Sequence, residues 1–220
     1  MAAGSRTKSR LTKAEQARQT RLRVIAAATT LFVRDGFLNA TMAAIAGEAG
    51  VAVQTLYLSF GNKSAILKAT FDLALAGDDE PIPVAERPWV QETRDQPDAL
   101  AALGIVVDGL TQIQRRTSPL YEVIRGAAAD PEIRELLATE KRARHAGVAL
   151  IAQLLSTKRG FDTSLSVDNA TGVLYGVLSE DLYGLLVVEH GWTFEQWRAW
   201  VLTTLSEQLI SPKHRRAKRV

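Results

Sequence analysis

Apolar positions recur along most of the chain with the spacing of a helix. Between about residues 15 and 35, apolar side chains return at intervals of three and four, which is the period of an amphipathic helix. These side chains are Leu22, Ile25, Ala28, Leu31 and Phe32. Strand-like alternation is missing, and glycine and proline fall where helices would end. The pattern predicts an all-α chain of about nine helices.

The first 76 residues predict four helices. They cover 15–35, 42–49, 53–60 and a stretch from Asn62 or Ser64 to Ala76. Thr41 is a good N-cap for the second helix, and Gly50 supplies a tight turn before the third. Two helices of two turns joined by such a turn are typical of a helix-turn-helix, whose second helix enters the major groove of DNA. We therefore predict a helix-turn-helix domain over residues 15–76.

The remainder of the chain predicts a second helical domain over residues 77–210. Residues 77–98 hold four prolines and many charges and predict a linker or loop. Helices are expected over 99–117, 120–128, 131–156, 166–189 and 193–210. The first two are separated at Ser118-Pro119, because proline inside a helix removes a hydrogen bond. Thr193 and Gln196 form the pattern of a capping box at the start of the last helix.

Charge is concentrated at the two ends of the chain. The formal net charge of the 220 residues is only +3, but residues 1–23 hold seven Arg and Lys against one acid. Residues 211–220 add five more basic side chains, so the residues between are net acidic. We predict a basic disordered arm over 1–14 and a basic tail over 211–220. Such arms are common in nucleic-acid binders, and solvated tails without a partner are the alternative.

Composition excludes several classes of protein. The chain has no cysteine and only three, widely separated histidines, so disulfides, thiolate metal sites and a cysteine nucleophile are excluded. We expect no metal and no cofactor. The most apolar stretch, 170–188, is interrupted by Glu180 and Asp181, which argues against a membrane span. The basic N-terminus lacks the apolar segment of a secretory signal, and a cytoplasmic protein is expected.

The helix over 53–60 carries the candidate base contacts. Its expected exposed positions are Val53, Gln54, Thr55, Tyr57 and Ser59. Gln54 can pair with adenine, Thr55 can touch a thymine methyl or a phosphate, and the Tyr57 hydroxyl suits a phosphate oxygen. A packing role for Tyr57 and a purely capping role for Thr41 are the structural alternatives.

Residues 21–69 resemble the DNA-binding domain of the TetR (tetracycline repressor) family of bacterial regulators. The matching positions are Leu31-Phe32, Gly36-Phe37, Thr41, Ile45-Ala46, Ala49-Gly50-Val51, Thr55-Leu56-Tyr57, Phe60 and Lys63. The resemblance implies that Thr41, Tyr57 and Lys63 contact phosphates. It places Val53, Gln54 and Thr55 nearest the bases. Arg18 and Arg21 are either near the DNA or on a solvated helix face. The sequence departs from the family at Ala52 and Ser59, so specificity is left open.

The same resemblance implies that the C-terminal helices bind a small-molecule inducer and form a homodimer. Candidate pocket residues are Trp89, Leu103, Val107, Tyr121, Ile124, Arg125, His145, Ala149 and Tyr175. Among these, His145 lies in a charged segment typical of a surface, and Arg125 suggests an anionic group on the ligand. Candidate dimer residues are Gly172, Gly176, Gly184, Trp197, Trp200, Val201 and Leu205. An intramolecular core is the alternative for this second set.

We expect a ligand-responsive regulator of transcription, a repressor that binds a palindromic operator in double-stranded DNA as a dimer and is released by a small-molecule inducer. One alternative is a DNA-binding regulator without a ligand. Another is an all-α enzyme such as a prenyl-chain synthase. Asp78-Asp79 is the only acidic pair that could seed a metal site, and no second aspartate follows at helical spacing. No catalytic residues are predicted, and no membrane partner is expected.

Overall fold

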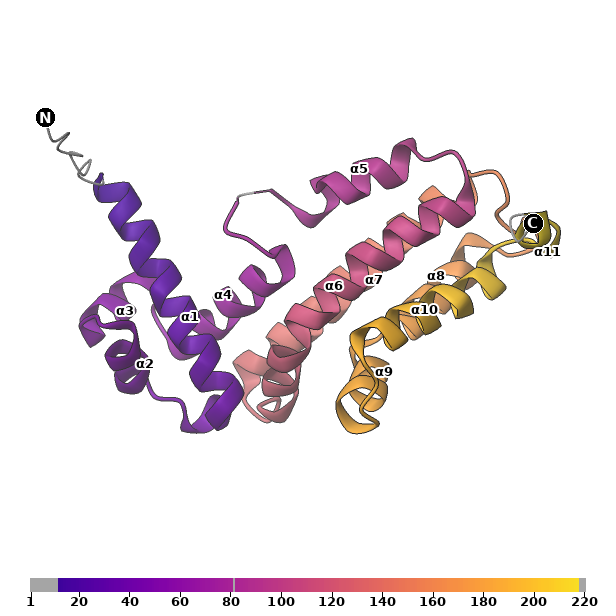
Figure 1. The fold of residues 1–220 in the computed structure, drawn as a ribbon. Helices are drawn as coiled ribbons and strands as arrows, with labels where there is room; N and C mark the ends of the chain where they lie inside the picture. The colour runs from indigo at the N-terminus through magenta and orange to yellow at the C-terminus, as the bar shows by residue number, and fades with distance from the viewer. Residues whose placement is uncertain (1–11, 81, 218–220) are drawn as a thin grey trace, which may run out of the picture. The chain divides into compact units, whose positions relative to one another are not determined.

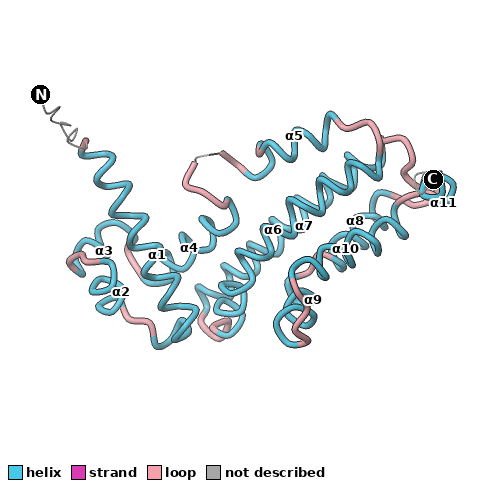
Figure 2. Tube along the Cα trace, in the orientation of Figure 1, coloured by secondary structure: helices cyan, strands magenta, loops and turns pink. Residues whose placement is uncertain are grey.

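The computed structural model describes residues 12–80 and 82–217, and these residues are helical with two isolated single-residue bridges in place of strands (Figure 1). Loops join the helices, and longer ones follow α4 and α7 (Figure 2). The contacts divide the chain into two compact units, Met1–Thr70 and Phe71–Val220. We refer to these as unit 1 and unit 2. The all-α prediction is confirmed.

Unit 1 contains three helices and the start of a fourth. They are α1 (Lys13–Asn39), α2 (Met42–Ala49), α3 (Val53–Phe60) and α4 (Lys63–Ala76). Their core is built from fully buried apolar side chains, among them Phe32, Ile45, Leu56, Ile66 and Leu67. The predicted bounds of α2 and α3 are confirmed, and α1 starts two residues earlier than predicted, in a capping box formed by Thr12 and Glu15.

Glycine sets two of the changes of direction in unit 1. At Gly36 the backbone of α1 takes φ +78°, so the helix kinks there and continues to Asn39 beyond its predicted end. At Gly50, φ is +65°, a left-handed conformation that glycine adopts without strain. This turn sends α3 away from α2 at 106°, which lies within the range of about 90–120° for a helix-turn-helix.

Unit 2 is a bundle of longer helices. In chain order they are η1 (Val84–Glu86), α5 (Pro88–Asp95), α6 (Ala99–Gly126), α7 (Pro131–Ser156), α8 (Val167–Val177), α9 (Glu180–Tyr183), the π-helical turn η2 (Gly184–Glu189), α10 (Phe194–Leu209) and α11 (Pro212–Ala217). Helix α6 packs against α5, α7 and α10, while α8 packs against α7 and α10. Buried side chains of α6, α7, α8 and α10 form the shared core. Trp197 is the largest of the fully buried side chains in it.

Two predictions about proline-containing segments are wrong. Residues 77–98 are not a plain loop, because Pro88 stands at the first turn of α5, where a missing N–H costs no hydrogen bond. The predicted break at Ser118-Pro119 is absent, and α6 runs through Pro119. Thr117, Ser118 and Leu120 are buried around it, so packing on both sides holds the helix together.

The predicted helix over 166–189 is broken. Ser166 caps α8 as predicted, but α8 ends at Val177, and Ser179 caps the separate helix α9 with a bond from Leu182 N to Ser179 Oγ. Among the described residues, Val167–Glu189 is the one run whose length and apolar composition would suffice to cross a membrane, and α2 with α3 would qualify only as a bent pair. For both segments this follows from length and composition only.

The basic tail contains a helix that the sequence did not predict. In α11, His214 Nε2 lies 2.9 Å from Asp98 Oδ2, and its ring packs over Gly160. Arg215 Nη1 donates to the carbonyls of Ser206 and Glu207 at the end of α10, at 3.0 and 2.7 Å. Cationic groups stabilise a helix C-terminus, so the described part of this tail serves the packing of unit 2.

Candidate nucleic-acid interface and internal cavity

Helix α3 presents an uncharged, exposed face. Leu56 is fully buried and fixes the helix in unit 1, whereas 54% of Tyr57 is accessible. Gln54 and Ser59 are exposed as predicted. Val53 and Thr55 were expected to be exposed, but both are half-buried.

Leu58 is the exposed position on α3 that sequence reasoning missed. Its exposure is 88%, the highest among the large apolar side chains of the described residues. A helix turns by about 100° per residue, so Leu58 lies across the helix from buried Leu56. This spacing from Leu56 could have predicted the exposure of Leu58 from the sequence. Like the methyl group of Thr55, the apolar side chain of Leu58 can contact a thymine methyl group.

Thr41 caps α2, and its side chain is exposed. Its Oγ accepts a hydrogen bond from Ala44 N at 3.1 Å, which confirms the predicted N-cap. The first turn of a helix carries backbone N–H groups without helical partners and a partial positive charge. This end of α2 therefore suits a phosphate, whether or not the threonine hydroxyl itself takes part.

Lys63 is held by unit 1 itself. Its Nζ donates to Phe37 O at 2.6 Å and lies 3.3 Å from Leu38 O, and it sits 4.4 Å from the centroid of the Phe37 ring. The side chain is half-buried. The lysine thus ties the first turn of α4 to the segment that follows the kink in α1. The sequence identified Lys63 as charged but gave no sign of this positioning role.

Basic side chains of α1 flank α3. Arg18 and Arg21 are exposed, and the guanidinium carbon of Arg21 lies 4.6 Å from the centroid of the Phe60 ring at the end of α3. Arg23, which was not predicted, places a guanidinium nitrogen 3.9 Å from the position a Cβ would take at Gly50. Positive charge therefore stands beside both ends of an uncharged α3. The predicted basic arm falls mainly in residues 1–11, outside the described residues.

Unit 2 contains a partly open cavity of about 320 Å³. Most of its lining is apolar and comes from the C-terminal part of α4, from η1, and from α5, α6 and α7. The apolar lining residues are Phe71, Leu75, Val84, Ala85, Trp89, Val90, Leu110, Ile113, Ala143, Gly147, Val148, Leu150, Ile151 and Leu178. Its size and apolar character are typical of small-molecule sites.

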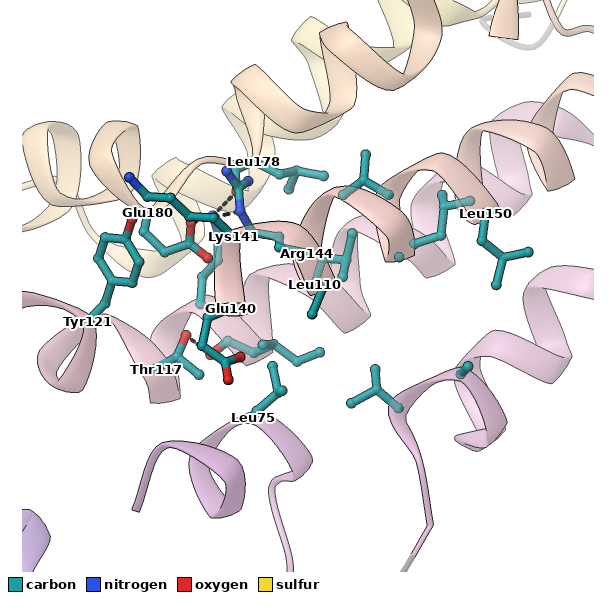
Figure 3. A pocket seen from close by; sticks show the side chains of 18 of the residues that line it. Leu75, Leu110, Thr117, Tyr121, Glu140, Lys141, Arg144, Leu150, Leu178 and Glu180 are labelled. Atoms are coloured by element: carbon teal, nitrogen blue, oxygen red, sulfur yellow. Dashed lines mark hydrogen bonds and ion pairs between the residues drawn. The ribbon is translucent and has the colours of Figure 1, made fainter. Parts of the chain in front are cut away.

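Several charged and polar side chains gather at one end of this cavity, and Glu140 of α7 also belongs to its lining. Tyr121, Lys141, Arg144 and Glu180 lie together there, while Leu150 lies far from them along the lining (Figure 3). Arg144 Nε is 3.2 Å from Glu180 Oε2. Burial raises the pKa of Glu180 above its usual value, and Arg144 only partly opposes this. Burial, together with the nearby carboxylates of α9, raises the pKa of Tyr121 to about 12.

The structure brings only part of the predicted pocket together. Trp89 and Tyr121 line the cavity as predicted. The predictions for Leu103, Val107 and Ile124 are wrong, since these side chains are packed inside the core and do not line the cavity. The sequence missed Arg144 and Glu180, because Arg144 belongs to a charged run and Glu180 to an apolar one.

Four further predicted pocket residues lie outside the cavity lining. Arg125 is exposed and pairs with Glu122 and Asp181 at 2.9 and 2.8 Å, so the anionic ligand group that it suggested has no support. His145 is exposed, with its ring edge toward Tyr175. Tyr175 and Ala149 are half-buried, and Tyr175 carries the guanidinium of Arg144 on its ring.

The predicted dimer residues divide into two sets. Trp197, Val201 and Leu205 have no exposed surface because they fill the core of unit 2, so their assignment to an interface is wrong. Trp200 is half-buried and stacks on Trp197, with ring centroids 5.5 Å apart. Gly172 and Gly176 are exposed, and a Cβ at either would meet no atom within 4 Å. Gly184 is half-buried, and a Cβ there would lie 3.7 Å from a carboxylate oxygen of Glu122.

Within residues 12–80 and 82–217, no group of three or more His, Asp or Glu side chains could hold a metal ion. Asp78, part of the acidic pair considered above, instead pairs with Arg87 at 2.7 Å.

Comparison with known proteins agrees with this geometry. Residues 24–70 match the family described as "Bacterial regulatory proteins, tetR family". No curated protein matches the chain. Among solved structures, a putative TetR-family transcriptional regulator from Rhodococcus sp. has 18% identity and a TM-score of 0.67, and the alignment covers 88% of this chain and 100% of that one.

Two further solved structures share the fold. A putative transcriptional regulator from Saccharomonospora viridis, in complex with choline, is 19% identical with a TM-score of 0.65, over 88% of this chain and 99% of that one. NalD, the secondary repressor of the MexAB-OprM multidrug efflux pump in Pseudomonas aeruginosa, is 15% identical with a TM-score of 0.66, over 89% and 99%. Residues 24–70 thus match bacterial regulatory proteins of the tetR family, and the chain as a whole shares its fold with these solved structures.

Proposed function

We propose that this chain is a repressor that binds a palindromic operator as a homodimer in the bacterial cytoplasm and leaves it when a small molecule enters the cavity of unit 2. The observation that carries the proposal is the path of α4. Its C-terminal part supplies Phe71 and Leu75 to the cavity wall, and its first residue, Lys63, is bonded into the helix-turn-helix unit. One continuous helix therefore connects the ligand site with the DNA-binding unit.

Helix α3 is the element proposed to enter the major groove. Its exposed side chains Gln54, Tyr57 and Leu58 supply hydrogen-bonding and apolar groups without any charge. Gln54 can read an adenine edge, and Tyr57 can donate to a phosphate. The attraction to the DNA backbone comes from the exposed side chains of Arg18 and Arg21 and from the first turn of α2, and Arg21 lies beside the end of α3.

Ligand binding is proposed to act by moving the C-terminal part of α4. Arg116 holds this end, with Nε donating to Ala74 O at 2.8 Å and Nη2 to Leu75 O at 3.3 Å. A ligand packed against Phe71 and Leu75 favours a different position of the helix, and differential affinity for two conformations is what shifts an equilibrium. The displacement reaches the DNA-binding unit through the backbone of α4.

The homodimer is proposed to form on the outer face of α8, α9 and η2. Gly172 and Gly176 leave open space along α8, and Leu185 and Val188 expose 51% and 64% of their surface. Small residues permit close approach of a second helix, and exposed apolar side chains are the usual content of an interface. A two-fold dimer would present two α3 helices about 34–36 Å apart, one for each half of a palindrome.

A selection of genomic DNA fragments with the purified full chain tests this proposal. We expect the enriched fragments to share an inverted repeat with half-site centres about 10 base pairs apart or a multiple of this spacing. Fractions of a cell extract that contain small molecules should then release the protein from such a fragment. Failure to enrich any fragment would refute the proposed function. Binding that no small-molecule fraction alters would favour a regulator without a ligand.

A further inference from the structure

Two polar side chains in the cavity lining are already engaged by unit 2. Gln114 Nε2 donates to Leu178 O at 2.6 Å, and its Oε1 accepts from Trp197 Nε1 at 3.1 Å. Thr117 Oγ donates to Ile113 O at 3.0 Å. These bonds hold the core of unit 2 together, so neither side chain determines which ligand head group fits.

Arg144 is also held in place by the protein. Its Nη1 donates to Tyr175 O at 3.0 Å and lies 3.4 Å from Leu178 O, at the end of α8. Its guanidinium carbon lies 3.7 Å from the centroid of the Tyr175 ring. An anionic ligand group that turned this guanidinium toward itself would break its hydrogen bond to Tyr175 O. The arginine is therefore a poor receptor for an anion.

Glu180 differs from these groups. It is the first residue of α9, and only 12% of its side chain is exposed. Its Oε2 lies 3.2 Å from Arg144 Nε, longer than the distance of about 2.7–2.9 Å in a strong charge-assisted bond. An ionised carboxylate offers about four acceptor positions. Burial raises the pKa of this carboxyl in spite of Arg144, so its negative charge is incompletely balanced.

The rest of the cavity suits an apolar body with a cationic end. The ring of Tyr121 lies beside Glu180 at the polar end (Figure 3). Trp89 is fixed by close packing on Gly109, where a Cβ would approach its ring to 2.6 Å. Aromatic rings attract cations through their faces, and leucine side chains line the remaining wall.

We propose that the ligand of this cavity is an apolar molecule with one protonated amine, seated with the amine against Glu180 and with its body along Leu75, Leu110 and Leu150. This inference rests on the proposed function, whose inducer it assigns to a chemical class. The cation supplies the counter-charge that Arg144 provides only in part. An anion at the same place would face the Glu180 carboxylate instead.

Three probes of equal size distinguish the possible head groups: 4-phenylbutylamine, 4-phenyl-1-butanol and 4-phenylbutyrate. Calorimetric titration of the full chain without DNA measures each affinity. We expect the amine to bind about tenfold more tightly than the alcohol, as for a charge pair in a partly buried site, and the carboxylate to bind most weakly. A carboxylate that binds as tightly as the amine, or an amine that does not bind at millimolar concentration, would overturn the proposal.

A matched pair of variants locates the effect. Glu180→Gln keeps the shape of the side chain and removes its charge, so it should weaken the amine about tenfold and leave the alcohol within about twofold. Asp181→Asn makes the same change at the next residue, whose exposed carboxylate pairs with Arg125 outside the cavity lining. Because Asp181 contributes only a minor share to the raised pKa of Glu180, this variant should change each affinity by less than about twofold. Equal effects of the two variants on the amine would overturn the proposal.

The pH dependence of the wild type needs no variant. The charged groups around Glu180 are Arg144 and Lys141 from α7 and Asp181 from α9, and Tyr121 of α6 stays neutral because its pKa is about 12. Since a protonated carboxyl offers no counter-charge, amine affinity should rise with pH as Glu180 ionises, while alcohol affinity stays level. A level or falling amine affinity would contradict the assignment. Glu180→Gln should lose the rise.

These binding measurements are independent of operator binding. If the chain binds an operator but prefers the carboxylate probe, the proposed function stands and the amine assignment fails. If the chain binds the amine at Glu180 but no DNA, the assignment stands and the proposed function fails.

Discussion

Lys63 joins two segments of unit 1 that lie 26 residues apart in the chain. Its ammonium is bonded to backbone carbonyls next to Phe37, so removing it would affect the folding of unit 1 as well as any phosphate contact. Hydrogen bonds from a charged donor contribute about 1.5–3 kcal/mol each. The contacts of Lys63 therefore stabilise the fold of unit 1.

Lys63→Met should lower the free energy of unfolding by about 1–3 kcal/mol, because methionine keeps the aliphatic stem and loses the bonds to the carbonyls. Urea denaturation followed by circular dichroism measures the change. Lys68→Met, an exposed lysine of the same helix, serves as the control and should stay within about 0.5 kcal/mol of the wild type. Equal stability of the two variants would show that the Lys63 contacts do not hold α4.

Individual side chains of the cavity were only partly predictable. Trp89 and Tyr121 were among the residues assigned to the pocket because the resemblance implies a ligand cavity among the C-terminal helices. Arg144 lies in the run Lys-Arg-Ala-Arg-His, which indicates a solvated face, and its burial depends on the carbonyls of Tyr175 and Leu178 more than thirty residues away. No local pattern carries that information.

At the scale of elements, the break between α8 and α9 is held by a residue of α6 that is distant in the sequence. Gln114 of α6 accepts from the indole of Trp197 and donates to Leu178 O at the end of α8. These groups are buried, so each needs its partner. The glutamine thus fixes the bend that brings Glu180 to the cavity.

Gln114→Leu should destabilise unit 2, since it leaves the buried indole N–H of Trp197 unpaired at a cost of about 1–3 kcal/mol and removes the shorter of two hydrogen bonds to Leu178 O. Gln112→Leu is the matched control, because Gln112 is exposed on the same helix. Thermal and urea unfolding of the three proteins measures the difference. If both variants unfold like the wild type, the bridge does not stabilise the break.

Sequence predicted the elements whose signals are local. The bounds of α2 and α3 followed from the cap at Thr41 and the glycine turn at Gly50. The sequence-based prediction failed where contacts with other helices determine the structure. Helix α6 continues through Pro119 because the neighbouring residues are buried. At Leu178 the helix ends, although the continuous apolar pattern gave no sign of a break. The short helices α5 and α11 also depend on contacts outside themselves.

At the scale of the whole molecule, the proposed assembly is a homodimer that uses α8, α9 and η2. The apolar stripe of α10 was misassigned to this interface because apolar periodicity does not distinguish a core from a contact surface. Trp197, Val201 and Leu205 belong to the core. Gly172 and Gly176 on α8 are the positions left open to a second copy.

The wild type should therefore sediment with twice the mass of one chain, and Gly176→Arg should shift it toward the monomer. Arginine is a better helix former than glycine by about 0.8–1 kcal/mol, so the change does not weaken α8 itself. Gly47→Arg is the control, because Gly47 is an exposed helical glycine of unit 1 with equally open surroundings. A dimer that survives Gly176→Arg would exclude this face.

In the proposed mechanism a ligand in the cavity acts on DNA binding through the chain, and α4 (Lys63–Ala76) runs from unit 1 into unit 2. Both ends of this helix are held by long side chains, Lys63 at the start and Arg116 at the end. The proposed release of the protein from DNA by a ligand presupposes that α3 binds the DNA in the first place.

The most direct test is the affinity of the full chain for an enriched operator fragment, compared with that of the Gln54→Ala/Tyr57→Ala variant by fluorescence anisotropy at one salt concentration. Both side chains are exposed on α3, so the variant should fold like the wild type. We predict that the variant binds at least about tenfold more weakly, because it loses a base contact and a phosphate contact. Equal affinity of the two proteins would contradict the assignment of α3 as the recognition helix.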